Sequence, residues 1–432
     1  MPASSSSDAG PTGLLTDRYE LTMLEAALAD GSAGRTCVFE VFARRLPEGR
    51  RYGVVAGTAR LLELIENFVF PAEQVAWLRE QGVIGDATAG HLSGYRFTGD
   101  VDGYPEGELY FPYSPILTVR GSFADAVALE TLVLSVLNHD CAVASAAARF
   151  VTAAGDRPVI EMGSRRTHEQ AAVAAARAAY LAGFSATSNL AAGRQFAIPT
   201  TGTAAHAFTL LHDDELTAFA SQVKSLGAGT TLLVDTYDIT RGIALAAQAA
   251  GPELGAIRID SGDLGVLAHQ ARAQLDALGC HRTKIVVSGD LDEHSIAALA
   301  AAPVDSYGAG TAVVVGSGAP TAGLVYKLVE VEGRAVAKRS ADKATQGGRK
   351  TAWRRFRATG TATEEVVSAA PDHRPQDGDR PLQRPLMRHG RPVGDVPGLR
   401  ASRTHLAEAR VTLPWEGLRL SRGEPAIPTS HG

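Results

Sequence analysis

Residues 256–264 read AIRIDSGDL, a short apolar run followed by the acidic residues Asp260 and Asp263. Such a run, closed by a glycine turn, is typical of a buried strand. Six further segments repeat this pattern of an apolar run followed by acidic, hydroxyl, histidine or glycine residues. They are VIEMGSRRTH (159–168), FSATSNL (184–190), PTTGTAAHAF (199–208), LLVDTYD (232–238), KIVVSGDLDE (284–293) and DSYGAGTAV (305–313).

Helix-like runs such as EQAAVAAARAAYLAG (169–183) and EHSIAALAAAP (293–303) separate these segments. Alternating strands and helices predict a parallel sheet with crossover helices, so we expect the α/β class and an irregular, incomplete (β/α) barrel of about seven strands. In such barrels the carboxyl ends of the strands form the active face. The polar residues at these ends therefore indicate an enzyme.

The sequence before the barrel predicts a different, β-rich part. TDRYELTMLEAALADG has the pattern of an amphipathic helix that begins after Thr16 or Asp17 and ends at Gly31. The extended runs TCVFEVFARRL (36–46) and RYGVVAG (51–57) flank Pro47-Glu48-Gly49 and predict a hairpin.

Residues 123–154 contain no Gly or Pro and predict a long helix or helix pair that leads into the barrel. After Lys327 short strands return, and residues 399–413 predict a last helix that docks on the first part. We therefore expect a disordered tail at 1–11, an N-terminal part at 12–122, the barrel with its bridging helices at 123–327, and a C-terminal part at 328–432 that rejoins the N-terminal part.

Composition excludes several classes of protein. The 432 residues are 45% hydrophobic and 21% charged with a formal net charge of -5, which argues against a broad nucleic-acid-binding face. Cys37, Cys141 and Cys280 have no paired spacing, so a reducing cytoplasm fits best. The first residues lack the pattern of a signal peptide, and we expect no segment apolar enough to span a membrane.

The segment Arg258-Ile259-Asp260-Ser261-Gly262-Asp263 places one cation and two carboxylates at a strand end. Such carboxylates can hold Mg²⁺ through water or stabilise positive charge on a sugar carbon, and Arg258 can pair with an anionic substrate. A salt bridge with Asp263 as a helix cap explains the segment equally well. Asp235 and Asp238 favour a functional interpretation, because a second acidic strand end is harder to explain by capping.

Glycines follow the last two predicted strands. Gly308-Ala309-Gly310-Thr311 and Ser288-Gly289-Asp290 would let backbone N–H groups approach a phosphate, at the strands where such barrels usually bind one. Each cluster alone could equally be a tight turn.

Two further candidates are ambiguous from the residues alone. His206 lies among small residues, and a single histidine in such a setting is more often structural than catalytic. Arg165 and Arg166 could bind phosphate, although such a pair is commonly only a solvated helix start.

Taken in order, these segments resemble nicotinate phosphoribosyltransferases. The resemblance runs from about residue 12 to 355, and the segment RPLMRHGRPVG near residue 385 is more weakly similar. It is carried by TDRYELTM, FEVFARRLP, EMGSRRTHEQ, ATSNLAAGRQFAIPTTGTAAHAF, VDTYD, IRIDSGDL, YGAGTAVV and LVYKLVEV.

The resemblance implies a fold and a reaction. The barrel would be accompanied by a smaller open-faced α/β sandwich built from both chain ends. The enzyme would join nicotinate to 5-phosphoribosyl 1-pyrophosphate, giving nicotinate mononucleotide and pyrophosphate in NAD salvage. ATP as co-substrate would phosphorylate His206, and Mg²⁺ would be the cofactor. We expect a cytoplasmic homodimer with no nucleic-acid or membrane partner.

The resemblance also assigns roles to residues. Tyr19 would stack on the pyridine ring across the dimer interface, while Thr203 and Arg258 hold nicotinate. Asp235 and Asp260 would lie near the ribose and Mg²⁺ and act with His206 in catalysis. The remaining predicted substrate contacts are Arg165, Arg166, Ser261, Asp263, Ser288, Gly289, Gly308, Gly310 and Thr311, of which Gly289, Gly310 and Thr311 would cradle the 5′-phosphate.

Met162 stands where relatives place an aromatic residue beside the ring, which would make the contact there a thioether one. Two alternatives stay open. The base could be nicotinamide or quinolinate, or the barrel could be a nucleotide-binding sensor or scaffold without catalysis. The presence of His206, Asp235, Asp260 and Thr311 disfavours the scaffold.

Overall fold

The computed structural model describes residues 10–338, 346–370, 373–394 and 397–432, in two compact units. The first unit comprises residues 1–142 and 321–432 and the second residues 143–320, so the first draws on both chain ends and contains more residues than the second. The predicted tail at 1–11 falls almost entirely outside the described residues.

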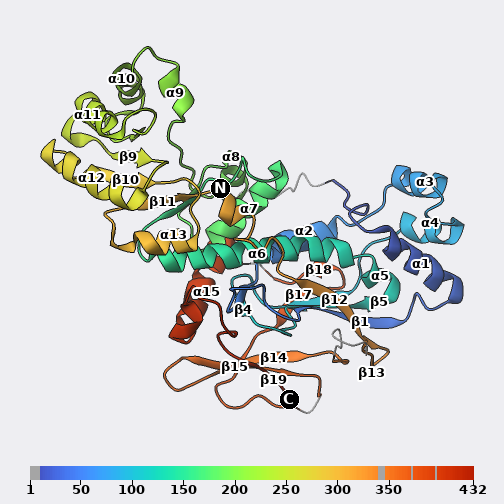
Figure 1. Ribbon diagram of the computed structural model, residues 1–432. Helices are drawn as coiled ribbons and strands as arrows, with labels where there is room; N and C mark the ends of the chain where they lie inside the picture. The colour runs from blue at the N-terminus through green and yellow to red at the C-terminus, as the bar shows by residue number, and fades with distance from the viewer. Residues whose placement is uncertain (1–9, 339–345, 371–372, 395–396) are drawn as a thin grey trace. The chain divides into compact units, whose positions relative to one another are not determined.

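The second unit contains a curled, fully parallel sheet of six strands in the order β7-β6-β11-β10-β9-β8. Its strands are β6 (Val159–Glu161), β7 (Ala186–Thr187), β8 (Thr231–Leu233), β9 (Ala256–Ile259), β10 (Lys284–Val287) and β11 (Ser306–Ala309). Figure 1 labels β9, β10 and β11 of this sheet. The α/β class and an incomplete barrel are thus confirmed.

The seventh predicted strand, near residue 200, is only an isolated parallel bridge between Thr187 and Thr200. Pro199 has no N–H group to donate to a ladder, and the residues that follow Thr201 are small. A regular strand therefore does not extend from this point.

Helices join successive strands of this sheet, and α12 contacts β10 (Figure 1). The helices are α7 (Glu169–Ala182), α8 (Leu190–Phe196), α9 (His206–Leu210), α10 (Glu215–Leu226), α11 (Ile239–Ala250), α12 (Leu264–Ala277), α13 (Glu293–Ala298) and α14 (Thr311–Val314), with 3-10 turns at Gly251–Glu253 and Leu299–Ala301. Because each strand precedes a turn into a helix, the polar residues after the strands gather along one edge of the sheet.

The first unit is built on a seven-stranded sheet in the order β13-β12-β1-β5-β3-β17-β18. Its strands are β1 (Thr36–Ala43), β3 (Asp100–Gly103), β5 (Leu117–Ser122), β12 (Leu324–Val331), β13 (Arg334–Ala335), β17 (Arg384–Arg388) and β18 (Arg391–Pro392). Separate sheets are formed by β2 (Gly53–Val54) with β4 (Leu109–Tyr110), and by β14 (Thr351–Phe356), β15 (Ala362–Ser368), β16 (Arg380–Pro381) and β19 (Thr429–His431).

The predicted hairpin around Pro47-Glu48-Gly49 is wrong. Strand β1 pairs with β12 and β5, whereas β2 pairs with β4. All but one of the side chains of β1 are buried, as expected for a central strand. Its Phe39 ring stacks on Tyr326 of β12 with centroids 4.8 Å apart, so apolar pairing between distant parts of the chain decides the partner.

Helix α1 (Arg18–Asp30) begins and ends as predicted. Asp17 and Glu20 form a capping box at its start, and Gly31 closes it with φ +80°. The other helices of this unit are α2 (Thr58–Glu66), α3 (Ala72–Glu80), α4 (Asp86–Ser93), α5 (Phe123–Val127) and α15 (Leu399–Val411), with a 3-10 turn at Trp415–Leu418.

The predicted final helix, α15, docks on this unit. His405 lies with Nε2 3.0 Å from Glu108, a fully buried carboxylate. The predicted helix pair is formed by α5 and α6 (Glu130–Ala154). Among the described residues, the stretch Phe123–Ala154 is long and apolar enough to cross a membrane, contrary to expectation, but most of it is buried, as in the core helix of a globular protein.

Candidate active site

Residues that follow the three strands β8, β9 and β10 meet at one edge of the second unit's sheet. The backbone N–H of Asp260, after β9, donates to Asp235 Oδ2, after β8, at 2.8 Å. Ser288, after β10, donates its backbone N–H to Ile259 at 3.0 Å. The parallel order of the strands thus brings together side chains that lie more than 20 residues apart in sequence.

Arg258 lies at the centre of this cluster and is largely buried. Its Nε donates to Ser288 Oγ at 2.6 Å, one terminal nitrogen to Thr203 Oγ1 at 3.0 Å, and the other to Asp260 Oδ1 at 2.7 Å. A guanidinium carries five N–H donors, so two remain for a ligand, one on each terminal nitrogen. Two donors in one plane suit a carboxylate.

Asp260 remains ionised more readily than an ordinary aspartate. Partial burial opposes the charged form, but the hydrogen bond from Ser288 and the charge of Arg258 outweigh this effect and lower the pKa of Asp260. The cluster therefore keeps a negative charge beside the two unused Arg258 donors.

Asp235 is buried, and only one of its two oxygens is satisfied. Oδ2 accepts hydrogen bonds from the backbone of Asp260 and, at 2.7 Å, from the Ser261 hydroxyl. Oδ1 is buried and has no hydrogen-bond partner among the described residues. It lies 3.9 Å from His206 Nε2. A buried carboxylate oxygen without a partner is costly, and such atoms are expected where a ligand or cation completes the site.

His206 is the first residue of α9 and faces this oxygen. Its Nδ1 lies 3.0 Å from Thr236 Oγ1, while 42% of the side chain is exposed. The imidazole is therefore held at one nitrogen and open to solvent. Thr236 was not predicted as a site residue; its position directly after Asp235 was the only signal in the sequence.

Two acidic residues near the cluster are helix caps. Asp238 Oδ1 accepts from Arg241 N at 2.7 Å at the start of α11, and Asp263 Oδ1 accepts from Val266 N at 3.1 Å at the start of α12. The expectation that the acidic residues of VDTYD are harder to explain by capping is thus wrong for Asp238. Asp263 is also explained by capping, and its contact with a substrate stays a prediction.

Glycine is required at Gly289 after β10 and at Gly308, which lies in the last residues of β11 and not after the strand as predicted. Gly289 has φ +116°, and a Cβ there would lie 2.9 Å from the Asp260 carbonyl oxygen. A Cβ on Gly308 would lie 2.8 Å from Met162 Sδ, which places the thioether at this edge of the sheet. Gly310 precedes α14, of which Thr311 is the first residue.

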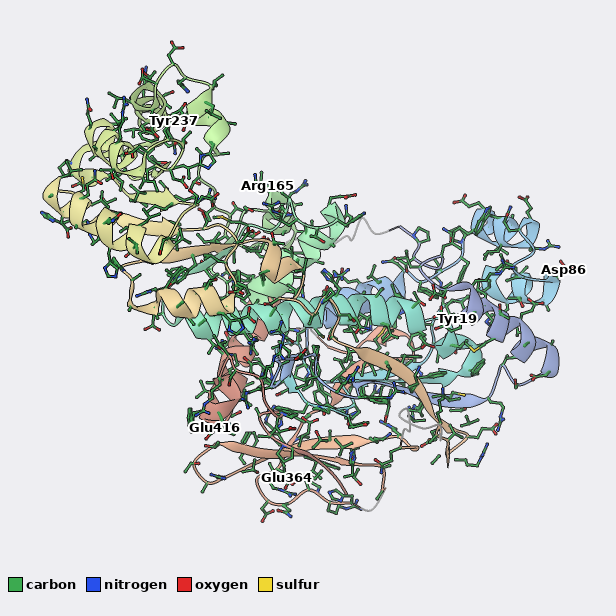
Figure 2. All side chains as sticks on the ribbon, in the orientation of Figure 1. Tyr19, Asp86, Arg165, Tyr237, Glu364 and Glu416 are labelled. Atoms are coloured by element: carbon green, nitrogen blue, oxygen red, sulfur yellow. The ribbon has the colours of Figure 1, made fainter. Side chains whose placement is uncertain are left out.

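Arg165 and Arg166 lie in an exposed turn after β6, closed by a 2.8 Å hydrogen bond from Arg166 N to the Gly163 carbonyl. Figure 2 labels Arg165. In the described part of the chain neither guanidinium forms an ion pair. Tyr19 belongs to the first unit, on α1, where 46% of it is exposed. Burial of the phenol and the nearby charge of Glu130 raise the pKa of Tyr19.

The donor set suits a metal that keeps most of its waters. No group of three or more His, Cys, Asp or Glu residues able to hold a metal occurs within the described ranges. Mg²⁺ is commonly held by one or two carboxylates together with substrate phosphates. Asp235, with its unpartnered oxygen, and the ionised Asp260 meet that requirement.

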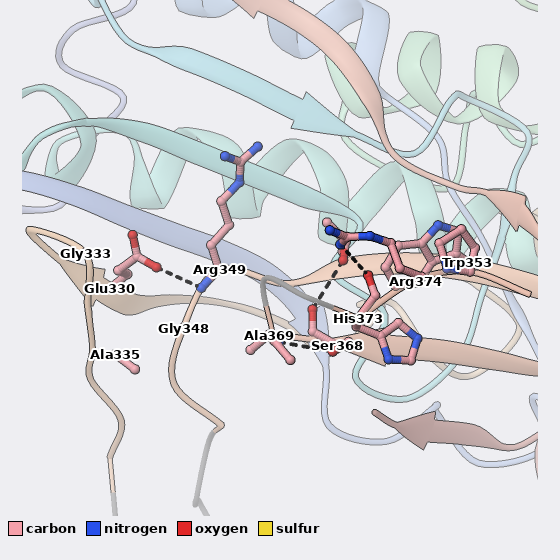
Figure 3. A pocket seen from close by; sticks show the side chains of 13 residues that line it. Glu330, Gly333, Ala335, Gly348, Arg349, Trp353, Ser368, Ala369, His373 and Arg374 are labelled. Carbon is pink, nitrogen blue, oxygen red and sulfur yellow. Dashed lines mark hydrogen bonds between the residues drawn. The ribbon is translucent and has the colours of Figure 1, made fainter.

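A separate hollow of about 680 Å³ lies in the first unit between the edges of two sheets (Figure 3). Trp353, His373, Arg349 and Arg374 are among the side chains that line it. None of the residues predicted for the active site contributes to this hollow.

Comparison with known proteins gives a consistent result. A family model described as the nicotinate phosphoribosyltransferase N-terminal domain matches residues 14–138. The chain is 64% identical over 430 residues to nicotinate phosphoribosyltransferase pncB1 of Mycobacterium tuberculosis, covering 97% of this chain and 95% of that protein. Identity to the Bacillus subtilis nicotinate phosphoribosyltransferase is 37% over 382 residues, covering 85% and 78%.

Solved structures agree. The crystal structure of human nicotinic acid phosphoribosyltransferase aligns with a TM-score of 0.83 at 26% identity, covering 96% of this chain and 98% of that one. The nicotinate-nucleotide pyrophosphorylase of Pyrococcus furiosus aligns with a TM-score of 0.78 at 26% identity, covering 93% and 95%.

Proposed function

Because the chain belongs to the nicotinate phosphoribosyltransferase family, we propose that it transfers the 5-phosphoribosyl group of phosphoribosyl pyrophosphate to nicotinate, at the strand-end edge of the second unit. The products are nicotinate mononucleotide and pyrophosphate, in NAD salvage. The observation that carries the assignment of the site is Arg258, a largely buried guanidinium with two unused donors beside an ionised carboxylate.

The cluster suits each part of the reaction. Arg258 binds the nicotinate carboxylate, and Thr203 holds the guanidinium in place. The pyridine nitrogen attacks C1′ of the ribose as the bond to pyrophosphate breaks. Positive charge develops at C1′, and the carboxylates of Asp235 and Asp260 stabilise it.

The phosphate groups of phosphoribosyl pyrophosphate bind to polar groups at this edge of the sheet. Arg165 supplies a guanidinium for the phosphate groups, and the backbone at Gly289, Gly310 and Thr311 receives the 5′-phosphate. Arg166, Ser261, Asp263, Ser288 and Gly308 complete the proposed substrate site. Mg²⁺ held by Asp235 and Asp260 would neutralise the pyrophosphate leaving group.

His206 is the proposed acceptor of the ATP γ-phosphate. Thr236 holds one ring nitrogen, so the ring is oriented, and its exposure leaves it accessible to ATP. A neutral imidazole nitrogen is a competent nucleophile toward phosphorus. Coupling through this phosphohistidine would make the transfer an ATP-dependent, ligase-type reaction.

Tyr19 is the proposed stacking partner of the pyridine ring, supplied by the second subunit of a homodimer. Its exposed ring lies one helical turn from Met23 on α1, so the two exposed side chains form a short apolar stripe on this helix. A second copy of the chain would cover this stripe. The three free cysteines suit a cytoplasmic enzyme, and the formal net charge of -5 suits a protein without a nucleic-acid partner.

Turnover with three bases tests the proposal. Purified protein is incubated with radiolabelled phosphoribosyl pyrophosphate, Mg²⁺ and either nicotinate, nicotinamide or quinolinate, with and without ATP. We expect product with nicotinate and faster turnover with ATP. Turnover only with nicotinamide or quinolinate would overturn the choice of base, and no turnover with any base would favour a sensor or scaffold.

A further inference from the structure

Glu161 is a buried carboxylate at the end of β6 that the proposed reaction does not use. Only 1% of the residue is exposed, and within the described residues no cationic side chain forms an ion pair with it. Burial raises the pKa of Glu161, although hydrogen bonds from Thr187 and Gly163 oppose the shift. A group that is costly to bury and bonded only to neutral donors requires an explanation.

Its two oxygens connect the turn after β6 to the last residue of β7. Oε1 accepts from the backbone N–H of Gly163, and Oε2 accepts from the Thr187 hydroxyl at 2.5 Å. Thr187 Oγ1 accepts in turn from Asn189 N at 2.9 Å, and Asn189 Nδ2 donates to Ser164 Oγ at 3.0 Å. Since Ser164 follows Gly163 directly, these hydrogen bonds and the chain between Gly163 and Ser164 together form a closed ring.

The same turn is packed against α14 and the glycine turn that precedes it. Met162 N donates to the Ala309 carbonyl at 2.7 Å. A Cβ on Gly163 would lie 2.2 Å from a Val314 methyl group and 3.1 Å from the Gly310 carbonyl oxygen. Gly163 is thus the point at which the turn after β6 meets the glycine turn after β11, and Glu161 holds its N–H group.

Two exposed residues extend from this base. Arg165 lies two residues beyond Gly163, and Thr311 follows Gly310 directly. Both residues are exposed, so packing of their own side chains does not hold them in place. The ring closed by Glu161 holds the backbone from which Arg165 projects, and the close approach of Gly163 to Gly310 aligns that backbone with the turn before Thr311.

We propose that Glu161 is a positioning residue for phosphoribosyl pyrophosphate: it touches no substrate, but it holds the turn that carries Arg165 in register with the Gly310–Thr311 turn. The inference rests on the proposed function, because it requires this substrate. It adds a residue, and an interaction with Thr187, that the strand-end cluster around Arg258 does not contain.

Steady-state kinetics of two pairs of variants tests the inference. In Glu161→Ala, loss of hydrogen bonds to the turn should raise KM for phosphoribosyl pyrophosphate about tenfold and leave KM for nicotinate within about twofold. Glu161→Gln should restore most of this loss, because its amide can accept from Gly163 and donate to the Thr187 hydroxyl. Thr187→Val and Thr187→Ser form the second pair. Thr187→Val, which lacks the hydroxyl, should raise KM for phosphoribosyl pyrophosphate as Glu161→Ala does, and Thr187→Ser, which keeps it, should not. This pair still tests the inference if Glu161→Ala does not fold.

A double variant separates positioning from a general loss of stability. If Glu161 acts through Arg165, Glu161→Ala combined with Arg165→Ala should raise KM for phosphoribosyl pyrophosphate hardly more than Arg165→Ala alone. Additive increases, or equal increases of both KM values, would overturn the inference. Wild-type protein that forms no nicotinate mononucleotide would instead refute the proposed function, so the two failures are distinct.

Discussion

Replacing Arg258 by Lys tests whether the cluster depends on the planar guanidinium, because the substitution keeps the positive charge but removes the fork of N–H donors. Arg258 directs three nitrogens to three different partners at 2.6 to 3.0 Å and keeps one donor on each terminal nitrogen. A single ammonium group cannot satisfy Ser288, Thr203 and Asp260 and also bind a carboxylate at two points.

The expected magnitude follows from the contacts that are lost. At least one of the two charge-assisted hydrogen bonds to nicotinate would disappear, which costs about 2 kcal/mol, or about 30-fold in kcat/KM for nicotinate. The assay measures initial rates of nicotinate mononucleotide formation with each substrate varied in turn. KM for phosphoribosyl pyrophosphate should change far less, because Arg258 meets the base.

Arg272→Lys is a matched control. Arg272 also has three partners, Asp276 and the carbonyl oxygens of Thr283 and Cys280, but it lies on α12 and contacts none of the cluster. This variant should lose some thermal stability and keep the wild-type kcat/KM. If Arg258→Lys keeps kcat/KM for nicotinate within about twofold of wild type, the reasoning about the guanidinium fork is wrong.

Three further predictions address other residues. His206→Ala should abolish acid-labile phosphate incorporation from ATP and leave a slower, ATP-independent transfer; unchanged incorporation would exclude His206 as the acceptor. Mixing Tyr19→Ala and His206→Ala at equal concentrations should restore ATP-dependent turnover at about a quarter of the sites if Tyr19 acts across a dimer, because half of the dimers then contain one intact site. No recovery in that mixture would place Tyr19 in its own subunit's site or outside any site. Burial raises the pKa of Glu20 from 4.5 to about 7, so the melting temperature should fall as pH rises between these values, and Glu20→Gln, which keeps the capping box, should flatten that fall. An equal slope in the variant would contradict the assignment to Glu20.

Local patterns predicted the elements whose determinants are local. The capping box at Asp17 and the glycine at Gly31 bound α1 as expected, and the apolar runs before Asp260 and Ser288 are strands. The same patterns could not identify the partners of β1, because these are selected by contacts such as Phe39 with Tyr326, nearly 290 residues apart. The hairpin prediction failed for that reason.

The candidate site also has features that the sequence predicts and features that only the structure shows. The sequence indicated which residue types follow each strand, and parallel pairing explains why Arg258, Asp260 and Ser288 come together. The sequence could not distinguish the roles of two aspartates that lie three residues apart. Asp235 accepts a hydrogen bond from the backbone of Asp260, whereas Asp238 caps α11. That difference depends on the direction in which each side chain leaves the turn, and the structure is needed to determine it.

A crystal structure of the protein with bound nicotinate decides whether Arg258 binds the base. We expect the nicotinate carboxylate within hydrogen-bond distance of the two unused terminal N–H groups of Arg258, with the ring beside Met162 and Gly308. Nicotinate bound elsewhere, for example beside Trp353 in the hollow of the first unit, with Arg258 still bonded only to Ser288, Thr203 and Asp260, would contradict it.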